Sequence, residues 1–351
     1  MTGKDLLQAL SGGRGVSGYE SDLVPLLTKA FEPLVDQVKE DKLGNLVMLR
    51  RGSGSEPRKR IMLAAHMDEI GLVVTGYEPG GFLRFSNIGG IDERVLLAQT
   101  VVVHGKKDLV GVIGAKPPHI QEPGEQDKSV KIKDLFIDVG LDDETLKELV
   151  AIGDMATLAQ APIGLLNDRY AGKALDDRAG VVVMYLCLEI LAKLSHTADV
   201  YAVATVQEEV GVRGATVSTY GIVPDIGIAL DVGHGDIPGV PAYDTLPLGK
   251  GPGICIGPQV HPKIYDRLLE LAKKWGIPYG IEPATRPGGT DAYAIQITQH
   301  GIPTALISLP LRYMHTPVET LEWSDLEAAA RLLAMFICSI DSEFVEGLQC
   351  F

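Results

Sequence analysis

Apolar segments and amphipathic helices alternate along much of this chain, and that alternation most restricts its fold. The apolar runs that are short enough to be buried strands are residues 61–65, 200–206, 226–230 and 304–309. The periodicity of amphipathic helices occurs at residues 19–33, 178–195, 262–275 and 323–343. Strands that alternate with helices form parallel sheets covered on both faces. The sequence therefore predicts the α/β class, with a largely parallel sheet and helices on both faces.

Two of these helices are expected to open with a capping box. Ser17 and Glu20 precede the first helix, and Ser324 and Glu327 stand at the start of the last one. In this motif the serine hydroxyl and the carboxylate satisfy backbone N–H groups at the helix start.

Residues 71–164 differ from the rest of the chain. They contain short alternating segments separated by glycine, proline and acidic residues, which is typical of an all-β unit such as a small barrel. Because α/β patterns flank the segment on both sides, we expect an inserted β domain at 71–164. Residues 1–70 and 165–351 then form one α/β domain, and a total of 351 residues is ample for both.

Charge and composition argue against several classes of partner. The chain has 32 basic and 46 acidic residues, and no basic cluster is longer than residues 50–60, so a nucleic-acid partner is not expected. Neither a signal pattern nor an apolar stretch of ~20 residues is present, which predicts a cytoplasmic location without membrane contact. The cysteines are too widely spaced for a disulfide framework or a thiolate metal site: Cys187, Cys255, Cys338 and Cys350.

Polar side chains of the metal-ligand type follow the predicted strands. These are His66 and Asp68 after the first strand, Glu208 and Glu209 after the second, Asp231 after the third and His315 after the fourth, with Asp176 before the helix at 178. Each signal alone is weak, because such residues often cap helices or face solvent. The carboxyl ends of parallel strands meet at one edge of a sheet, however, and carboxylates crowded there would repel each other without cations.

A pair of divalent metal ions removes this repulsion. The candidate ligands are His66, Asp176, Glu209, Asp231 and His315. Two imidazoles and three carboxylates without a thiolate suit zinc, or cobalt or manganese, and the sequence does not decide among these metals. Three carboxylates and one bridging hydroxide balance the charge of two divalent ions.

The adjacent glutamates can divide two tasks. Beyond the strand end, Glu209 can bind metal while Glu208 stays free to act as the general base near a metal-bound water. Asp68 is expected to accept the other imidazole N–H of His66 and so to fix the tautomer that binds metal.

Five motifs occur in a fixed order: AAHMDEIG, ALDDRAG, VQEEVGVRGA, ALDVG and HTPVET. In this order and spacing, over nearly the whole chain, they resemble the glutamyl or deblocking aminopeptidases. These are dinuclear metallopeptidases that assemble as tetrahedral particles, and some members carry the label cellulase M or endoglucanase M. The resemblance implies a zinc-peptidase-like fold and removal of N-terminal residues from short peptides, with the bridging hydroxide as nucleophile.

The resemblance also implies a role for each site residue. Asp176 would bridge the two metals, with His66 and Asp231 completing one site and Glu209 and His315 the other. Glu208 would be the catalytic base, Asp68 would support His66, and the peptide bond after Asp176 would be strained or cis. The β domain would form dimers, and twelve subunits would enclose a cavity for short peptides.

The substrate pocket is expected near the glycine-rich residues 286–296. Thr290 or Asp291 would begin a helix there and present N–H groups to substrate, although the segment could equally be only a helix start. His234 is a further candidate for substrate contact. The preferred N-terminal residue is not indicated, with Arg286 the candidate for an acidic preference.

Two alternatives remain at this point. Paired carboxylates and the cellulase label of relatives raise the possibility of a glycoside hydrolase. Two tryptophans and 6% aromatic residues argue against the stacking platforms of such enzymes. A catalytically silent scaffold is the other alternative, and the presence of Glu208 with every candidate ligand argues against it.

Overall fold

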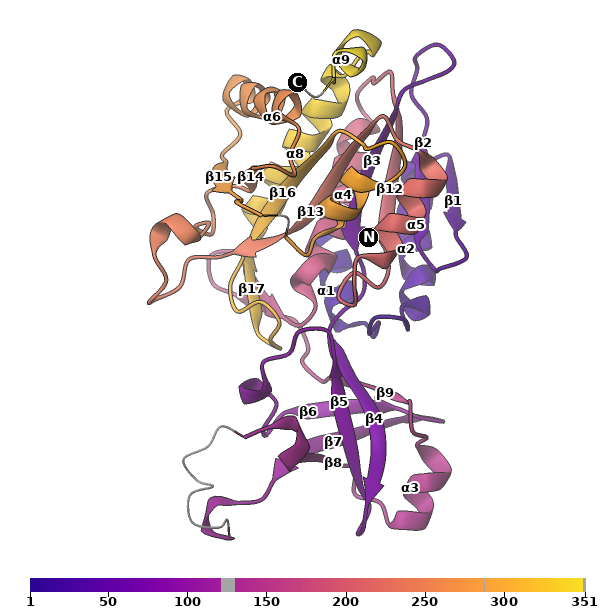
Figure 1. The fold of residues 1–351 in the computed structure, drawn as a ribbon, viewed down its shortest axis with the longest axis vertical. Helices are drawn as coiled ribbons and strands as arrows, with labels where there is room; N and C mark the ends of the chain where they lie inside the picture. Colours follow the sequence, from indigo (N-terminus) through magenta and orange to yellow (C-terminus); the bar gives the residue numbers. More distant parts are fainter. Residues whose placement is uncertain (121–129, 287, 350–351) are drawn as a thin grey trace.

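A computed structural model describes residues 1–120, 130–286 and 288–349. An α/β body occupies one end of the long axis and a β barrel the other (Figure 1). The α/β fold class and the barrel, both predicted from the sequence, are confirmed.

The body is built on one eight-stranded sheet. Its strands, in spatial order, are β1 (Gln37–Glu40), β2 (Leu46–Arg50), β12 (Asp199–Thr205), β3 (Arg60–His66), β13 (Ile226–His234), β16 (Thr304–Leu311), β14 (Gly253–Ile256) and β15 (Gly280–Pro283). The four apolar runs correspond to β12, β3, β13 and β16, which are mutually parallel. Antiparallel pairs join β1, β2 and β14 to their neighbours, so the sheet is parallel mainly in its centre. The carboxyl ends of the four central strands therefore share one edge.

Helices cover both faces of this sheet (Figure 1). One face packs against α4 (Leu175–Leu191) and α8 (Trp323–Ser339), with α1 (Gly3–Gly12) and α6 (Pro262–Trp275) against these two helices. The other face packs against α5 (Arg213–Ile222) and α7 (Asp291–Ile297). Apolar side chains from the sheet and the helices, such as Leu63, Ile228 and Leu333, form the buried core between these layers.

Smaller elements complete the body. They are α2 (Val24–Phe31), α9 (Ser342–Glu346) and a three-stranded antiparallel sheet of β10 (Ile163–Leu165), β11 (Arg169–Gly172) and β17 (Glu319–Glu322). No helix in the described ranges is long and apolar enough to cross a bilayer. Three of the cysteines, Cys187, Cys255 and Cys338, are free thiols, and Cys350 lies outside the described residues.

The barrel is closed and antiparallel. Its strands, in spatial order, are β4 (Gly71–Glu78), β5 (Phe82–Ile88), β8 (Leu135–Asp138), β7 (Asp108–Ala115), β6 (Thr100–His104) and β9 (Met155–Leu158), with α3 (Asp143–Leu149) between β8 and β9. Its apolar core, which includes Leu72, Leu83 and Ile137, is distinct from that of the α/β body. All these strands fall within residues 71–164, the segment predicted as an inserted domain.

The capping box predicted at Ser17 does not form. Ser17 Oγ donates to Asp68 Oδ2 at 2.6 Å, and Glu20 accepts backbone hydrogen bonds from Gly18 and Gln207. The α-helix begins only at Val24, after a single 3₁₀ turn. Ser17 and Glu20 therefore form other hydrogen bonds and do not cap the helix.

The capping box predicted at Ser324 is also absent. The helix begins at Trp323, and its Nε1 donates to Glu327 at 2.7 Å. Ser324 Oγ donates to Glu322 instead of capping a backbone N–H group. Glu327 is therefore held by the indole ring, and the helix ends at Ser339 rather than continuing to 343.

Candidate metal centre

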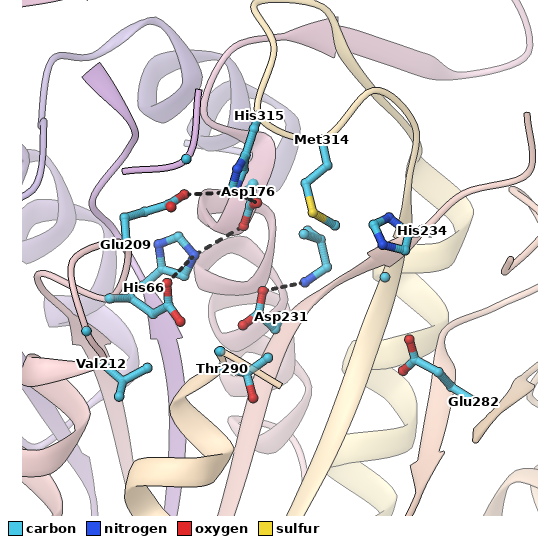
Figure 2. A pocket seen from close by; sticks show the side chains of 16 residues that line it. His66, Asp176, Glu209, Val212, Asp231, His234, Glu282, Thr290, Met314 and His315 are labelled. Atoms are coloured by element: carbon cyan, nitrogen blue, oxygen red, sulfur yellow. Dashed lines mark hydrogen bonds and ion pairs between the residues drawn. The ribbon is translucent and has the colours of Figure 1, made fainter. Parts of the chain in front are cut away.

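The predicted ligand residues meet at the carboxyl edge of the central strands. His66 ends β3, Asp231 lies on β13, Glu208 and Glu209 follow β12, Asp176 lies in the first turn of α4, and His315 follows β16 (Figure 2). All six line one cavity of about 580 Å³. Residues distant in the sequence thus form one polar cluster.

The cluster divides into two donor groups that share Asp176. One group is His66, Asp176 and Asp231, and the other is Asp176, Glu209 and His315, with the donor atoms of each group within 4.8 Å of one another. Asp176 Oδ1 lies 3.1 Å from His66 Nε2, and Asp176 Oδ2 lies 3.3 Å from His315 Nε2. The two oxygens of one carboxylate therefore face different groups, which suits a ligand shared by two cations.

The electrostatics of these groups fit divalent cations. Burial, followed by the charge of Asp176, raises the pKa of Asp231 well above its ordinary value. Hydrogen bonds to Asp176 and Glu209 raise the pKa of His315 to about 11. Without cations these surroundings favour the protonated form of each group, and binding of a divalent cation displaces such protons. Nitrogen and oxygen donors without thiolate suit zinc, cobalt or manganese.

Glu208 borders the donor groups but belongs to neither. Its Oε2 lies 4.0 Å from His66 Nε2, and its Oε1 is buried without a hydrogen-bond partner among the described residues. Burial, with the nearby charges of Asp231 and Asp291, raises the pKa of Glu208 to about 10. The structure therefore places a free carboxylate oxygen beside the cluster, in the same cavity.

Asp68 has more contacts than its sequence position suggested. His66 Nδ1 lies 3.2 Å from the backbone oxygen of Asp68 and 3.6 Å from its carboxylate Oδ1, so the nearer acceptor is the carbonyl. The carboxylate accepts hydrogen bonds from Glu208 N at 3.0 Å and Glu209 N at 3.2 Å, in addition to the one from Ser17. Asp68 thus holds the turn that carries both glutamates.

Replacing Asp68 by asparagine is expected to lower kcat/KM by about 10–100-fold, the usual effect of losing a group that orients metal ligands. The N–H groups of Glu208 and Glu209 donate to different oxygens of Asp68, and asparagine has only one acceptor oxygen, so one of these hydrogen bonds is lost and the Glu208–Glu209 turn should lose its position. Steady-state kinetics and metal content of the purified variant measure this effect. Asp266→Asn, an exposed change on α6, is the matched control. Equal activity of Asp68→Asn and the control would contradict the orienting role.

Glu319 is a site residue whose role the sequence did not predict. It is 2% exposed, and its Oε2 accepts hydrogen bonds from the backbone N–H groups of Leu175 at 2.7 Å and Asp176 at 3.1 Å. Its Oε1 accepts from His315 N at 3.0 Å. One carboxylate therefore fixes the backbone of a ligand in each donor group. The only sequence signal was its place in the HTPVET motif, four residues after His315.

A buried ion cluster supports the first turn of α4. Glu69 accepts hydrogen bonds from Lys173 Nζ at 2.7 Å and from Arg178 Nη2 at 3.1 Å, and all three side chains are buried. The Asp176–Asp177 peptide bond, which lies between Lys173 and Arg178 in the sequence, is cis, as the resemblance implied. Loss of one member of such a cluster leaves buried charge unpaired, so Glu69 anchors the segment that carries Asp176.

The candidate substrate residues occupy different positions. Thr290 and His234 line the cavity (Figure 2). Asp291 is 1% exposed, accepts a hydrogen bond from Thr205 Oγ1 at 2.6 Å and is not part of the cavity wall. The structure therefore brings Thr290 and His234, but not Asp291, to where a substrate could lie. Arg286 does not line the cavity either.

Comparisons with known proteins agree with this geometry. The model of the M42 glutamyl aminopeptidase family matches residues 44–332. The lysyl aminopeptidase of Pyrococcus furiosus is 37% identical over 93% of this chain and 94% of its own length.

Solved structures are similar over almost the full length. Aminopeptidase APDkam598 from the archaeon Desulfurococcus kamchatkensis has a TM-score of 0.92 at 40% identity, covering 99% of this chain and 97% of its own. The TET1 peptidase of Pyrococcus horikoshii, described as assembling into a tetrahedron or a large octahedral shell, has a TM-score of 0.85 at 34% identity, covering 97% and 100%. A protein of Thermotoga maritima titled endoglucanase has a TM-score of 0.78 at 32% identity, covering 98% and 99%. A family match over most of the chain, together with full-length relatives above 30% identity, shows that this chain belongs to the M42 glutamyl aminopeptidase family and is a peptidase.

Proposed function

We propose that this chain removes N-terminal residues from short peptides with two divalent cations, zinc, cobalt or manganese. The observation that carries the proposal is the pair of donor groups on either side of Asp176. Asp176 would be the shared ligand, His66 and Asp231 would complete one site, and Glu209 and His315 the other. Bound there, the cations supply polarisation of the scissile carbonyl and a lowered pKa for the attacking water.

Glu208 would be the general base. The pKa of about 10 belongs to the site without cations, and cations bound beside Glu208 would lower it so that the carboxyl group ionises. Its unpartnered Oε1 could then accept the proton of the attacking water and deliver it to the leaving amine. Asp68, through its contacts with the backbone of Glu208 and Glu209, would keep this oxygen in place. Thr290 and His234, which line the same cavity, would contact the substrate.

Assembly into a homo-oligomer is part of the proposal, with dimers building a dodecamer in the cytoplasm. Two large apolar side chains are exposed on one face of the barrel strand β7, because Val110 and Val112 are two positions apart: they are 68% and 51% exposed. Contiguous apolar side chains exposed on one surface favour contact between protein copies. Val110 and Val112 lie within residues 71–164 and support the inserted β domain as the element that joins subunits.

Chelation tests the metal-dependent reaction. Dialysis against EDTA should abolish hydrolysis of leucyl p-nitroanilide, and added zinc, cobalt or manganese should restore it, because no lysine or arginine among the described residues lines the cavity to polarise the carbonyl in place of the cations. A two-carboxylate glycoside hydrolase needs no metal, so activity on cello-oligosaccharides that survives EDTA would favour that alternative. Peptidase activity in protein shown by elemental analysis to be metal-free would contradict the proposal.

A further inference from the structure

Glu282 is a cavity carboxylate that neither donor group uses. It projects from β15 into the part of the cavity away from His66 and Glu209 (Figure 2). His234 and Met314 lie on the same side. A substrate whose scissile bond lies at the donor groups would therefore extend another of its groups toward Glu282.

The surroundings of Glu282 leave its charge without a strong basic partner. Its Oε2 accepts a hydrogen bond from Ser308 Oγ on β16, which lies beyond β14 in the sheet. Among the described residues, the basic side chain that acts on it is His234, and no lysine or arginine lines the cavity. Burial raises the pKa of Glu282 above its ordinary value, since the carboxylate has lost part of its hydration. A cation supplied by a ligand would compensate for that lost hydration.

A glycine lies close to this carboxylate in the cavity wall. Gly233 lies in the wall, and a Cβ at that position would be 3.0 Å from Glu282 Oε1, so any side chain there would crowd the carboxylate. Val232 and Met314 add apolar surface to the same wall. A carboxylate beside apolar surface suits a long side chain whose methylene groups pack while its charged end forms an ion pair.

We propose that Glu282 selects substrates whose N-terminal residue has a cationic side chain, lysine or arginine. The proposal rests on the proposed aminopeptidase activity and adds the substrate class. An acidic N-terminal residue would instead meet five cavity carboxylates, Asp176, Glu208, Glu209, Asp231 and Glu282, and Arg286 is not in the wall to offset them. The cations of the donor groups would balance the charge of the three carboxylates that bind them, Asp176, Glu209 and Asp231, and Glu282 is not among these.

The wild-type protein, loaded with zinc or cobalt, provides the first test. Norleucine has the aliphatic chain of lysine without its ammonium group, so the kcat/KM ratio of lysyl to norleucyl p-nitroanilide isolates the effect of the charge. We expect a ratio of at least about 30, the lower end for a partly buried charge pair. A ratio near one, or a preference for glutamyl p-nitroanilide, would overturn the proposal.

The variant Glu282→Gln provides the second test. Its amide oxygen can still accept from Ser308, so the strand contact is kept while the charge is removed. We expect the lysyl preference to disappear and norleucyl hydrolysis to stay at the wild-type rate. Glu270→Gln, an exposed change on α6, is the control and should keep the preference.

Three outcomes separate the possible failures. An equal loss for both substrates in Glu282→Gln would show that the residue holds the α-amine or the fold rather than the side chain, which overturns the selectivity. Hydrolysis of norleucyl p-nitroanilide without a lysyl preference would contradict the proposed selectivity and leave the proposed aminopeptidase activity standing. If the metal-loaded wild type cleaves no aminoacyl anilide, the proposed function fails and the selectivity fails with it.

Discussion

Glu208→Gln should lower kcat by about 10²–10⁴, the usual contribution of a positioned general base, and leave both cations bound. The glutamine keeps the size of the side chain but cannot take a proton from water. Because Glu208 belongs to neither donor group, the ligand set should be undisturbed. Stopped-flow or steady-state kinetics with leucyl p-nitroanilide measure kcat, and elemental analysis of the same sample measures its metal content.

The control for this experiment is Glu270→Gln, which removes an exposed carboxylate with the same change of atoms. A Glu208→Gln protein that turned over at the control rate would remove Glu208 from the reaction. Loss of the cations along with the activity would instead show that Glu208 is a ligand, contrary to the donor groups seen here.

Asp176→Asn is expected to have the largest effect on metal binding. Each carboxylate oxygen faces the imidazole of a different donor group, so one substitution should weaken both sites. An amide lacks the negative charge that stabilises two neighbouring cations. If the cations supply about 4 kcal/mol of transition-state stabilisation, their loss lowers kcat/KM by about 10³-fold.

Elemental analysis and calorimetric titration with zinc measure the number of cations that Asp176→Asn retains. Asp266→Asn should bind the same number as the wild type. Retention of one tightly bound cation by Asp176→Asn would contradict the shared-ligand role, because it would assign Asp176 to a single site. Circular dichroism of the variant confirms that the comparison is made on folded protein.

The ligand cluster could be predicted because strand ends are a property of local sequence. Each apolar run is followed, directly or within a few residues, by a histidine or a carboxylate, and the parallel order of β12, β3, β13 and β16 places the strand ends at one edge. His66 pairs in register with Thr205, three residues before Glu208. Short-range pattern and the general rule for parallel sheets were therefore sufficient to bring these residues together.

Residues whose contacts depend on tertiary packing could not be predicted. The sequence pairs Asp68 with His66, two residues away, but its carboxylate accepts from Glu208 N, 140 residues away. The capping box predicted at Ser17 does not form for the same reason, because the Ser17 hydroxyl donates to Asp68. Local motifs describe which hydrogen bonds are possible, and packing decides which of them form.

The position of Glu282 in the cavity could not be predicted from the sequence either, for a different reason. It lies on a four-residue strand, β15, with no long apolar run, and its place in the cavity depends on pairing with β14 at the sheet edge. Neither the length nor the pattern of residues 280–283 predicts that pairing. The sequence also suggested Arg286 for the pocket, whereas the folded chain places an acidic residue in the wall.

An anomalous-scattering crystal structure of the zinc-loaded protein tests the central claim most directly. We expect two anomalous peaks on either side of the Asp176 carboxylate, one bound by His66 and Asp231 and the other by Glu209 and His315. Glu208 should approach neither ion as a ligand. A single peak, or two peaks without Asp176 between them, would contradict the shared two-cation centre from which the proposed reaction follows.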